Sequence, residues 1–328
     1  KAKLNSVIKK SLQDIKRRYK DARRTEILYG HTEQQVTAET FKVVEDVVVS
    51  VDRSGYIRRA SVKNYNLSSK EAPVKAEDAL VLVEQAQTDM DLLLFSSLGY
   101  CYRIKIEDIP DYKWREKGCA PGRLCQGFAE NERIVLAVCY KNVLPETKVL
   151  FYTSRGMIEI SPLSEYAVKK NKFNAITLKE DDTLINAELS EKEASVLYIT
   201  RSGMSLNMDI SDISVTGRVT AGVKGISLEE EDSVVFARQI TEEGEIVVWS
   251  EKGYAKRSLA VDYELQMRAR KGLKTFDFRK NGSNGTRIAG AVYVKEPVDV
   301  LAVHATGEVE VFNSENIFIE ARLSAGKP

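Results

Sequence analysis

A short pattern of apolar and polar residues returns six times along the chain and predicts six β-hairpins. In the first copy, residues 47–65, valines at every second position mark one face of a strand, and Tyr56 begins the return strand after a turn at Asp52–Gly55. A short hairpin loop usually needs one residue at positive φ, which glycine adopts at the least steric cost. The turn glycines of the six copies are Gly55, Gly99, Gly156, Gly203, Gly253 and Gly307.

The spacing of these glycines predicts the architecture. They are 44, 57, 47, 50 and 54 residues apart, and a period of about 50 residues suits one four-stranded propeller blade per repeat. Between the hairpins runs a weaker pattern of apolar strand, acidic loop and apolar strand, clearest in residues 217–237. Because each unit is apolar on both faces, the units bury those faces only by stacking on one another. We therefore expect an all-β, six-bladed array, either closed or spiral.

The N-terminal segment follows a different pattern. Apolar residues from Leu4 to Ala22 fall at helical spacing with Lys and Arg between them, which predicts one amphipathic α-helix. The helical period is lost after Thr25, so we expect a helix and linker over 1–29 and the β array over 30–328. The basic face of the helix could touch nucleic acid, but an apolar stripe needs a partner surface and favours the end of a packed helical arm. A first residue that is not Met and the lack of a signal peptide suggest a cytosolic piece of a longer protein.

Charge is unevenly distributed along the chain. The 49 Lys and Arg nearly balance the 48 Asp and Glu, but residues 1–24 carry a net +8, which leaves −7 for the rest. A polyanion would therefore bind the β array through local basic patches. Basic residues follow the turn glycines of units one, two and five, whereas units three, four and six carry Glu159, Asn207 and Glu310 there.

Lys and Arg on turns and return strands contact phosphates without reading base sequence, which suits a protein that acts on any DNA. The alternative for each residue is an ordinary solvated strand face. The predicted DNA-binding residues are Arg53, Arg58, Arg59, Lys63, Arg103, Lys256, Arg257, Arg268, Arg270, Lys271 and Lys274.

Motifs for catalysis or metal binding are absent from the sequence. It contains no G-x-S-x-G, no phosphate-binding loop and no H-E-x-x-H. The four cysteines form no C-x-x-C pair, so we expect reduced, partly buried thiols. The acidic clusters at 180–182, 229–232 and 242–245 are expected to be solubilising turns. We predict no catalytic residue, no metal site and no cofactor in this chain.

Two stretches resemble the A subunits of bacterial type IIA topoisomerases, DNA gyrase and topoisomerase IV. Residues 15–27 look like the end of that family's coiled-coil arm, and residues 217–228 look like the recurrent inter-blade signature of its C-terminal domain. The resemblance implies a six-bladed β-pinwheel, a propeller-like ring whose blades exchange a strand with their neighbours and which binds DNA around its outer edge. The basic, glycine-rich heptad of gyrase is missing, and residues 92–99, 109–114 and 268–272 are more similar to topoisomerase IV of the Gram-positive type.

The resemblance also implies a division of labour. The tyrosine that breaks DNA in this family lies upstream of the coiled coil, so the chain would not be catalytic. ATP and Mg²⁺ would belong to the B subunit, which joins two A subunits in a heterotetramer, while the isolated piece would be monomeric, cytoplasmic and nucleoid-associated, with no membrane contact. Its expected role is to bind and bend the transported duplex, independently of sequence, during ATP-dependent decatenation and relaxation. The alternatives are a DNA-wrapping gyrase domain and a propeller-type protein-interaction scaffold.

Overall fold

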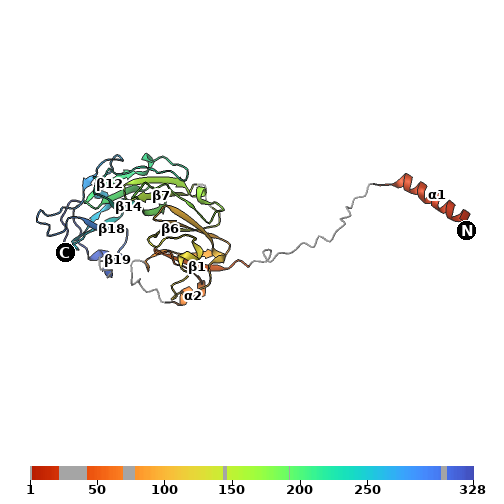
Figure 1. The fold of residues 1–328 in the computed structure, drawn as a ribbon, viewed down its shortest axis with the longest axis horizontal. Coiled ribbons are helices and arrows are strands. Elements are labelled where there is room, and N and C mark those ends of the chain that lie inside the picture. The colour runs from red at the N-terminus through yellow and green to blue at the C-terminus, as the bar shows by residue number, and fades with distance from the viewer. Residues whose placement is uncertain (1, 22–42, 69–77, 143–145, 192, 304–308) are drawn as a thin grey trace. The chain divides into compact units, whose positions relative to one another are not determined.

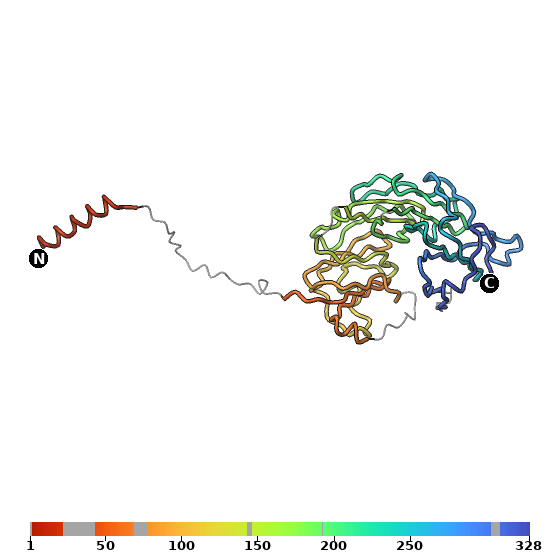
Figure 2. Tube along the Cα trace, turned by 180° about the vertical axis from the view of Figure 1, so that it is seen from behind, coloured from red at the N-terminus to blue at the C-terminus, as the bar shows by residue number. Residues whose placement is uncertain are grey.

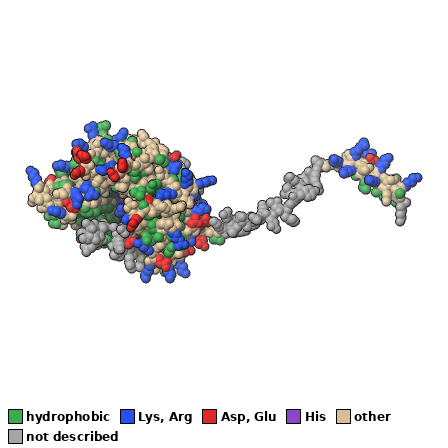
Figure 3. Space-filling model, viewed as in Figure 1, with side chains coloured by type: hydrophobic (Ala, Val, Ile, Leu, Met, Phe, Trp, Pro, Cys, Tyr) green, Lys and Arg blue, Asp and Glu red, His purple; other side chains and the backbone are tan. Residues whose placement is uncertain are grey.

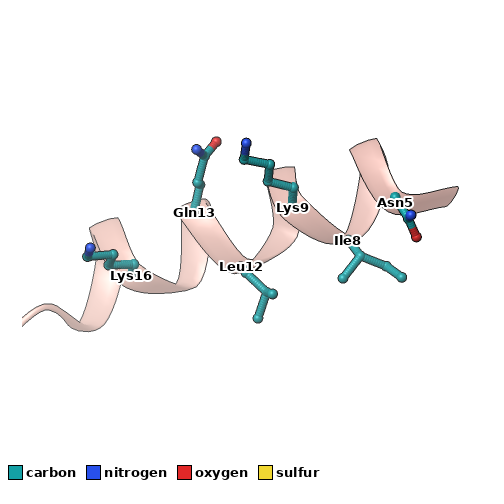
Figure 4. A pocket seen from close by; sticks show the side chains of 6 residues that line it. All are labelled: Asn5, Ile8, Lys9, Leu12, Gln13 and Lys16. Carbon is teal, nitrogen blue, oxygen red and sulfur yellow. The ribbon is translucent and has the colours of Figure 1, made fainter. Parts of the chain in front are cut away.

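The computed structural model forms two compact units, residues 1–43 and 44–328, which are considered separately. It describes residues 2–21, 43–68, 78–142, 146–191, 193–303 and 309–328. In the first unit, the predicted amphipathic helix is confirmed as α1 (Ala2–Tyr19), with no buried residue. Figure 4 shows Ile8 and Leu12 on one side of this helix and Lys9 and Gln13 on the other. The boundary predicted between residues 29 and 30 lies outside the described residues.

The second unit is built on six antiparallel hairpins, one for each sequence repeat, and each hairpin is the centre of one blade (Figure 1). In order of blades 1 to 6, they are β1 (Asp46–Asp52) with β2 (Ile57–Ser61), β4 (Asp91–Ser96) with β5 (Tyr100–Lys105), β7 (Lys148–Thr153) with β8 (Met157–Pro162), β11 (Ser195–Thr200) with β12 (Met204–Asp209), β15 (Glu245–Ser250) with β16 (Ala255–Leu259), and β19 (Asp299–Val303) with β20 (Val309–Asn313).

The predicted turn glycines are confirmed in the first five hairpins. Each has a φ between 77° and 87°, and its N–H donates to the carbonyl three residues earlier, as from Gly55 to Asp52 at 3.1 Å. The sixth, Gly307, lies outside the described residues. The turn glycine therefore marks the position of five of the six hairpins in the sequence.

An inner strand follows each of the first five hairpins and pairs with the hairpin's first strand. Successive inner strands contact one another, so they form the centre of the array. Figure 2 shows the β domain with its chain running from orange near its start, through green, to blue at the C-terminus. They are β3 (Leu80–Gln87), β6 (Ile134–Tyr140), β10 (Leu184–Leu189), β14 (Val234–Ile240) and β18 (Ile288–Val294).

The outer strand of each blade comes from the next repeat. In blades 2, 3 and 4 it is β9 (Lys172–Asn174), β13 (Val223–Lys224) or β17 (Leu273–Lys274), paired with the return strand of the preceding hairpin. In blades 1 and 5 the same edge is bridged by Cys119 and by Lys327. This strand exchange confirms the predicted six-bladed pinwheel, with four-stranded sheets in blades 2 to 4 and the hairpin β19–β20 as the described sheet of blade 6.

A short helix follows each return strand, and in blades 2 to 6 it leads into the exchanged segment of the preceding blade. We call residues 109–119, 167–174, 213–224, 263–274 and 317–327 the exchanged segments of blades 1 to 5. The helices are α2 (Val62–Leu67), η3 (Ile106–Asp108), η4 (Leu163–Tyr166), η5 (Ile210–Asp212), η6 (Ala260–Asp262) and η7 (Ser314–Asn316), and α3 (Pro121–Leu124) follows the first exchanged segment.

Hairpin strands of the middle blades contribute to two cores because each of these blades lies between two neighbours. In β4, Leu92 and Leu94 pack in a cluster with Val49 of blade 1. The alternate residues Leu93 and Phe95 pack in the cluster that contains blade 3 residues such as Phe151. The cores therefore lie between blades, which explains why these hairpins have apolar residues on both faces.

A second glycine position holds the exchanged segments of blades 1, 3, 4 and 5 against their return strands. Gly118, Gly222, Gly272 and Gly326 have φ between 64° and 97°. A Cβ at these positions would lie 2.2–3.1 Å from a carbonyl oxygen of the return strand, which leaves no room for a side chain in the first three. Glycine is needed here because the backbones of two repeats approach each other closely in a left-handed conformation.

We expect Gly222→Ala to lower the free energy of unfolding by about 1–3 kcal/mol, because the new methyl group meets the Ile158 carbonyl at 2.3 Å and φ is +64°. Gly217→Ala, in the same exchanged segment but with open space around its Cβ, is the control and should stay within about 0.5 kcal/mol of the unchanged chain. Urea unfolding measures both, and equal stabilities would contradict the proposed close approach.

Candidate nucleic-acid interface

The exchanged segments concentrate positive charge at the outer edge of the blades. They contain 14 Lys and Arg and four Asp and Glu, a net +10, although residues 25–328 together carry −7. They occupy the last position in the strand order of each blade, opposite the inner strands. On the face shown in Figure 3, Lys and Arg side chains project along much of the outline of the domain, with acidic side chains among them. A polyanion would therefore meet its strongest local attraction along this edge.

Blade 4 presents the densest group of exposed cations, and its four residues are all among those predicted to bind DNA. Arg268, Arg270, Lys271 and Lys274 are all exposed on its exchanged segment. Arg268 donates to the carbonyl of Lys224 at 3.4 Å, which brings the outer edges of blades 3 and 4 together. The ammonium of Lys271 lies 2.6 Å from the Glu229 carboxylate, and this hydrogen bond raises the pKa of Lys271.

The exposed cations on the other exchanged segments were not predicted from the sequence. They are Lys113, Arg115 and Lys117 in blade 1, Lys169 and Lys170 in blade 2, Lys224 in blade 3 and Lys327 in blade 5. An alignment on the second glycine would have matched Lys117 with Lys271 and Lys224 with Lys274. Exposed apolar side chains lie among the cations in blades 3 and 4, such as Val215, Leu265 and Met267.

Arg58 has an internal role that the sequence did not reveal. Its guanidinium donates to the Ser50 hydroxyl at 3.0 Å and to the carbonyls of Trp114 and Glu116, the latter at 2.8 Å. It also lies over the Trp114 ring, 4.3 Å from the centroid. Burial lowers the pKa of Arg58. The side chain therefore fastens the exchanged segment of blade 1 to its return strand.

Lys256 occupies the equivalent place in blade 5 and corrects the prediction of an exposed rim cation. The residue is fully buried. Its ammonium donates to the carbonyls of Ala321, at 3.2 Å, and Arg322 in the exchanged segment. Burial lowers the pKa of Lys256 to about 8. The prediction that this side chain lies on the solvent-exposed rim is wrong, because its donors are used inside the protein.

Arg59, Arg103 and Arg257 lie at a second equivalent position, and each pairs with one carboxylate. The partners are Asp111 at 2.8 Å, Asp91 at 2.6 Å and Glu245 at 2.9 Å, and the arginine side chains are only 13–21% exposed. The hydrogen bond to Asp91 raises the pKa of Arg103. The positive charge of these three arginines is largely balanced by their carboxylate partners. They therefore add less positive potential to the outer edge than their number suggests.

Arg53 and Lys63, in contrast, are exposed and make no ion pair within the described residues. Arg53 lies in the first hairpin turn, and Lys63 lies on α2. The structure thus divides the predicted residues into exposed cations, arginines paired with carboxylates, and side chains that hold an exchanged segment in place. Among them, only the four cations of blade 4 form a close group.

Glu159 lies three residues after its turn glycine, at the position that Arg58 and Lys256 take in blades 1 and 5. It is 1% exposed, and neither carboxylate oxygen makes a hydrogen bond of normal geometry. Burial raises the pKa of Glu159 to about 7, although nearby hydroxyl groups of Thr220 and Ser161 lower it in part. Blade 4 has Leu206 at this position, and Asn207, at the position of Arg59 and Arg103, donates to the carbonyl of Tyr263 at 2.8 Å.

The acidic loops combine exposed residues with one structural carboxylate. Asp182 accepts from the Ser154 hydroxyl at 2.9 Å, and Asp232 accepts from the Ser202 hydroxyl at 2.5 Å. Each therefore ties an acidic loop to a neighbouring hairpin turn, a role beyond the expected solubilising one. The remaining carboxylates of 180–181 and 229–231 are exposed.

Other classes of site find no support in the part of the chain that the structure describes. It contains no group of three or more His, Cys, Asp or Glu side chains that could hold a metal ion. No helix within it is both long and apolar enough to cross a membrane. The four cysteines are buried and free, and burial raises the pKa values of Cys125 and Cys139 to about 12.

Comparison with known proteins identifies one family. The model described as "DNA gyrase C-terminal domain, beta-propeller" matches residues 91–118, 147–191, 194–241 and 244–284. The A subunit of DNA topoisomerase 4 from Bacillus subtilis (strain 168) is 30% identical over 274 residues, which cover 83% of this chain and 34% of that protein. Its counterpart from Staphylococcus aureus (strain MRSA252) is 31% identical over 284 residues, 85% of this chain and 35% of that protein.

A solved structure agrees with these relatives. The crystal structure of the C-terminal domain of DNA topoisomerase IV superposes with a TM-score of 0.79 at 26% identity, covering 87% of this chain and 89% of that one. The chain spans about a third of the length of the curated relatives it matches.

The environment of Glu159 predicts a pH-dependent stability. Its pKa is about 7 in the folded protein against an ordinary value of 4.5, so between these values the folded state binds more protons than the unfolded state. The contribution of Glu159 to stability is therefore greatest below pH 4.5 and falls as the pH rises to about 7. At pH 8 we expect Glu159→Gln to be more stable than the unchanged chain by about 1–3 kcal/mol.

Urea unfolding between pH 4 and pH 8 measures this effect. Glu165→Gln, at an exposed position of the same blade, is the control and should keep the pH dependence of the unchanged chain. A Glu159→Gln profile parallel to that of the unchanged chain would show that the buried carboxyl is not the titrating group.

Proposed function

Because this chain belongs to the DNA gyrase C-terminal domain family, with relatives named as topoisomerase IV A subunits, we propose that its β domain binds duplex DNA along the outer edge of its blades. The observation that carries the proposal is the net +10 of the exchanged segments within an otherwise acidic domain. Overall charge would repel a polyanion, whereas the outer edge attracts it locally.

The residues of this edge suit contact with phosphates better than base reading. Lys and Arg neutralise phosphates and release counterions, which gives affinity that is independent of sequence. The cations come from short strands and turns beside left-handed glycines such as Gly222 and Gly272, and no helix among the described residues of the β domain is longer than the six-residue α2. Exposed Leu265 and Met267 add apolar surface that can contact the sugar edges of the duplex.

A duplex that follows several blades must curve. Exposed cations are repeated on the exchanged segments of blades 1 to 4, such as Arg115, Lys170, Lys224 and Arg268. Smoothly bending a site of about 20–30 base pairs costs on the order of 1–6 kcal/mol, and the additional phosphate contacts offset this cost. We therefore assign to the domain both binding and bending of duplex DNA.

The same proposal places the domain within a larger enzyme. It would be a non-catalytic part of the A subunit of a type IIA topoisomerase in the cytoplasm, at the nucleoid, and would position the transported duplex during decatenation and relaxation. The DNA-cleaving tyrosine would lie in another part of that polypeptide. ATP and Mg²⁺ would be handled by the B subunits, and two copies of each polypeptide would form the heterotetramer.

Reversing the charge of blade 4 tests the proposed interface. For Arg268→Glu, Arg270→Glu and Lys274→Glu combined, we expect duplex affinity at low salt to fall at least about tenfold. The slope of log K against log salt concentration should become less steep by roughly 2–3, because each phosphate contact contributes about 0.9. Fluorescence anisotropy with labelled duplexes of unrelated sequences measures both quantities.

The matched control reverses three exposed lysines that are outside the exchanged segments: Lys105→Glu, Lys179→Glu and Lys295→Glu. It changes the net charge equally, so it separates local contact from overall repulsion. Equal losses in the two variants would contradict a specific outer-edge interface, and no duplex binding by the unchanged chain at low salt would contradict the function.

Bending without strong wrapping is a separate expectation. The chain lacks the basic, glycine-rich heptad of gyrase, so we expect the domain to change the linking number of a nicked plasmid only slightly when the plasmid is ligated in its presence. Gel analysis of the topoisomers measures the change. A large positive shift in linking number would instead indicate a gyrase-like wrapping domain.

A further inference from the structure

The paired arginines of blades 2 and 5 reach the open end of their hairpins, where the first strand begins and the return strand ends. Arg103 bonds the carboxylate of Asp91, twelve residues earlier in the chain, at 2.6 Å. Arg257 bonds that of Glu245 at 2.9 Å, again across twelve residues. In both blades a guanidinium group of the chain itself therefore neutralises a carboxylate at the open end.

Blade 4 has the same two positions without either charge. Ser195 replaces the carboxylate and Asn207 replaces the arginine. Asn207 is only 5% exposed, and its amide nitrogen donates to the Tyr263 carbonyl at 2.8 Å. Its Oδ1 has no hydrogen-bond partner. A buried acceptor without a donor costs free energy, so this position lacks the donor that an arginine supplies in blades 2 and 5.

A cavity of about 490 Å³ lies at this open end, with Ser195 and Asn207 in its lining. Its volume is within the range of roughly 300–1,000 Å³ that is typical of ligand sites. Among the described residues that line it, the charged ones are all acidic: Glu193, Asp209, Glu242 and Glu264. All four are exposed, and none forms an ion pair with another described residue. A hydrogen bond from the Ser211 N–H lowers the pKa of Asp209.

The open ends of blades 1 and 3 are balanced differently. In blade 1, Arg59 bonds Asp111 at 2.8 Å, and Lys113 lies among the carboxylates that line the local cavity. In blade 3, the buried Ile160 replaces the arginine and Lys148 replaces the carboxylate. The cavity of blade 4, in contrast, has four carboxylates and no cation among the described residues of its lining.

The lining favours an extended organic cation over a metal ion. Within the described part of the chain, no group of three or more His, Cys, Asp or Glu side chains could hold a metal ion, so the four carboxylates are spread around the cavity. The lining also includes Val261 and Leu265, which are 57% and 62% exposed. An aliphatic chain with separate positive charges matches both features, because its methylenes contact the apolar side chains while its charges meet carboxylates.

We propose that the open end of blade 4 binds an aliphatic polyamine, an alkyl chain that carries two or more ammonium groups. One ammonium lies beside Asn207, in the place of the missing guanidinium, and supplies the donor that Oδ1 lacks. The other charges neutralise carboxylates of the lining, such as Glu242 and Glu264. This site does not depend on DNA binding, and its tests use the chain without DNA.

Isothermal titration calorimetry of the 328-residue chain with spermidine, at low salt, tests the site. We expect saturable binding of one spermidine, at least about fivefold weaker when Glu242→Gln and Glu264→Gln are combined. Glu230→Gln with Glu243→Gln is the matched control, because it removes the same charge from exposed residues that do not line the cavity. Its affinity should stay within about twofold of that of the unchanged chain. Equal losses in the two variants, or no saturable binding, would overturn the proposal.

A second test restores the arginine. Asn207→Arg combined with Ser195→Glu recreates the pair of blades 2 and 5 and should weaken spermidine binding at least about tenfold, because the new guanidinium occupies the site. Urea unfolding establishes that this variant is folded. A folded variant that binds spermidine as the unchanged chain does would overturn the site. The variants with exposed carboxamides decide the question if this one does not fold.

Two further measurements identify other sources of the positive charge. N-acetyl-arginine amide, with one guanidinium, should bind at least about tenfold more weakly than spermidine. Tighter binding of the arginine amide would assign the site to a side chain of another protein and overturn the polyamine. Lys192 precedes Glu193 in the sequence, and Lys192→Gln should change spermidine affinity by no more than about twofold. A gain of tenfold or more would assign the cavity to the chain's own lysine and overturn the proposal.

Discussion

The pairing of each return strand with backbone from the next repeat is the interaction on which the rest of this domain depends. A hairpin alone would present an edge of unpaired N–H and C=O groups, which invites pairing with other chains. Here Cys119 pairs with Ile57, Phe173 with Cys101, and Val223 with Ile158. These contacts join neighbouring repeats, and they also make the inter-blade cores possible, because the blades are held in sequence order.

The exchange determines where charge can accumulate. The first strands of the hairpins of blades 1 to 5 are largely buried, and an ionised side chain on a return strand beside them needs a partner, as Arg103 needs Asp91. The exchanged segments cover only one edge and leave their loops in solvent. Cations such as Arg268 and Lys170 therefore remain exposed without a desolvation cost. The acidic character of the rest of the domain makes this edge the place where a polyanion is attracted.

The fold was largely predictable from the sequence because its signals are local. Five turn glycines and the alternating valines of β1 identify the hairpins within a window of a few residues. The roles of single cations were less predictable, because their partners are distant in sequence. Arg58 binds the carbonyl of Glu116, 58 residues away, and Lys256 binds that of Ala321, 65 residues away. The sequence alone does not distinguish a basic residue that binds the backbone of the next repeat from one on the same strand that faces solvent.

Two kinds of cation therefore differ in what their replacement removes. Replacing Arg58 or Lys256 removes hydrogen bonds to carbonyls of an exchanged segment, so the first effect is on the attachment of that segment and any effect on DNA binding is secondary. Replacing Arg270 or Lys274 removes an exposed charge and leaves the pairing of β17 with β12 intact. Loss of DNA affinity in a variant is consequently informative about the interface only when its unfolding free energy is unchanged. In this architecture, the exchanged segment that completes a blade is also the segment that would contact DNA. Different side chains along the segment serve these two roles.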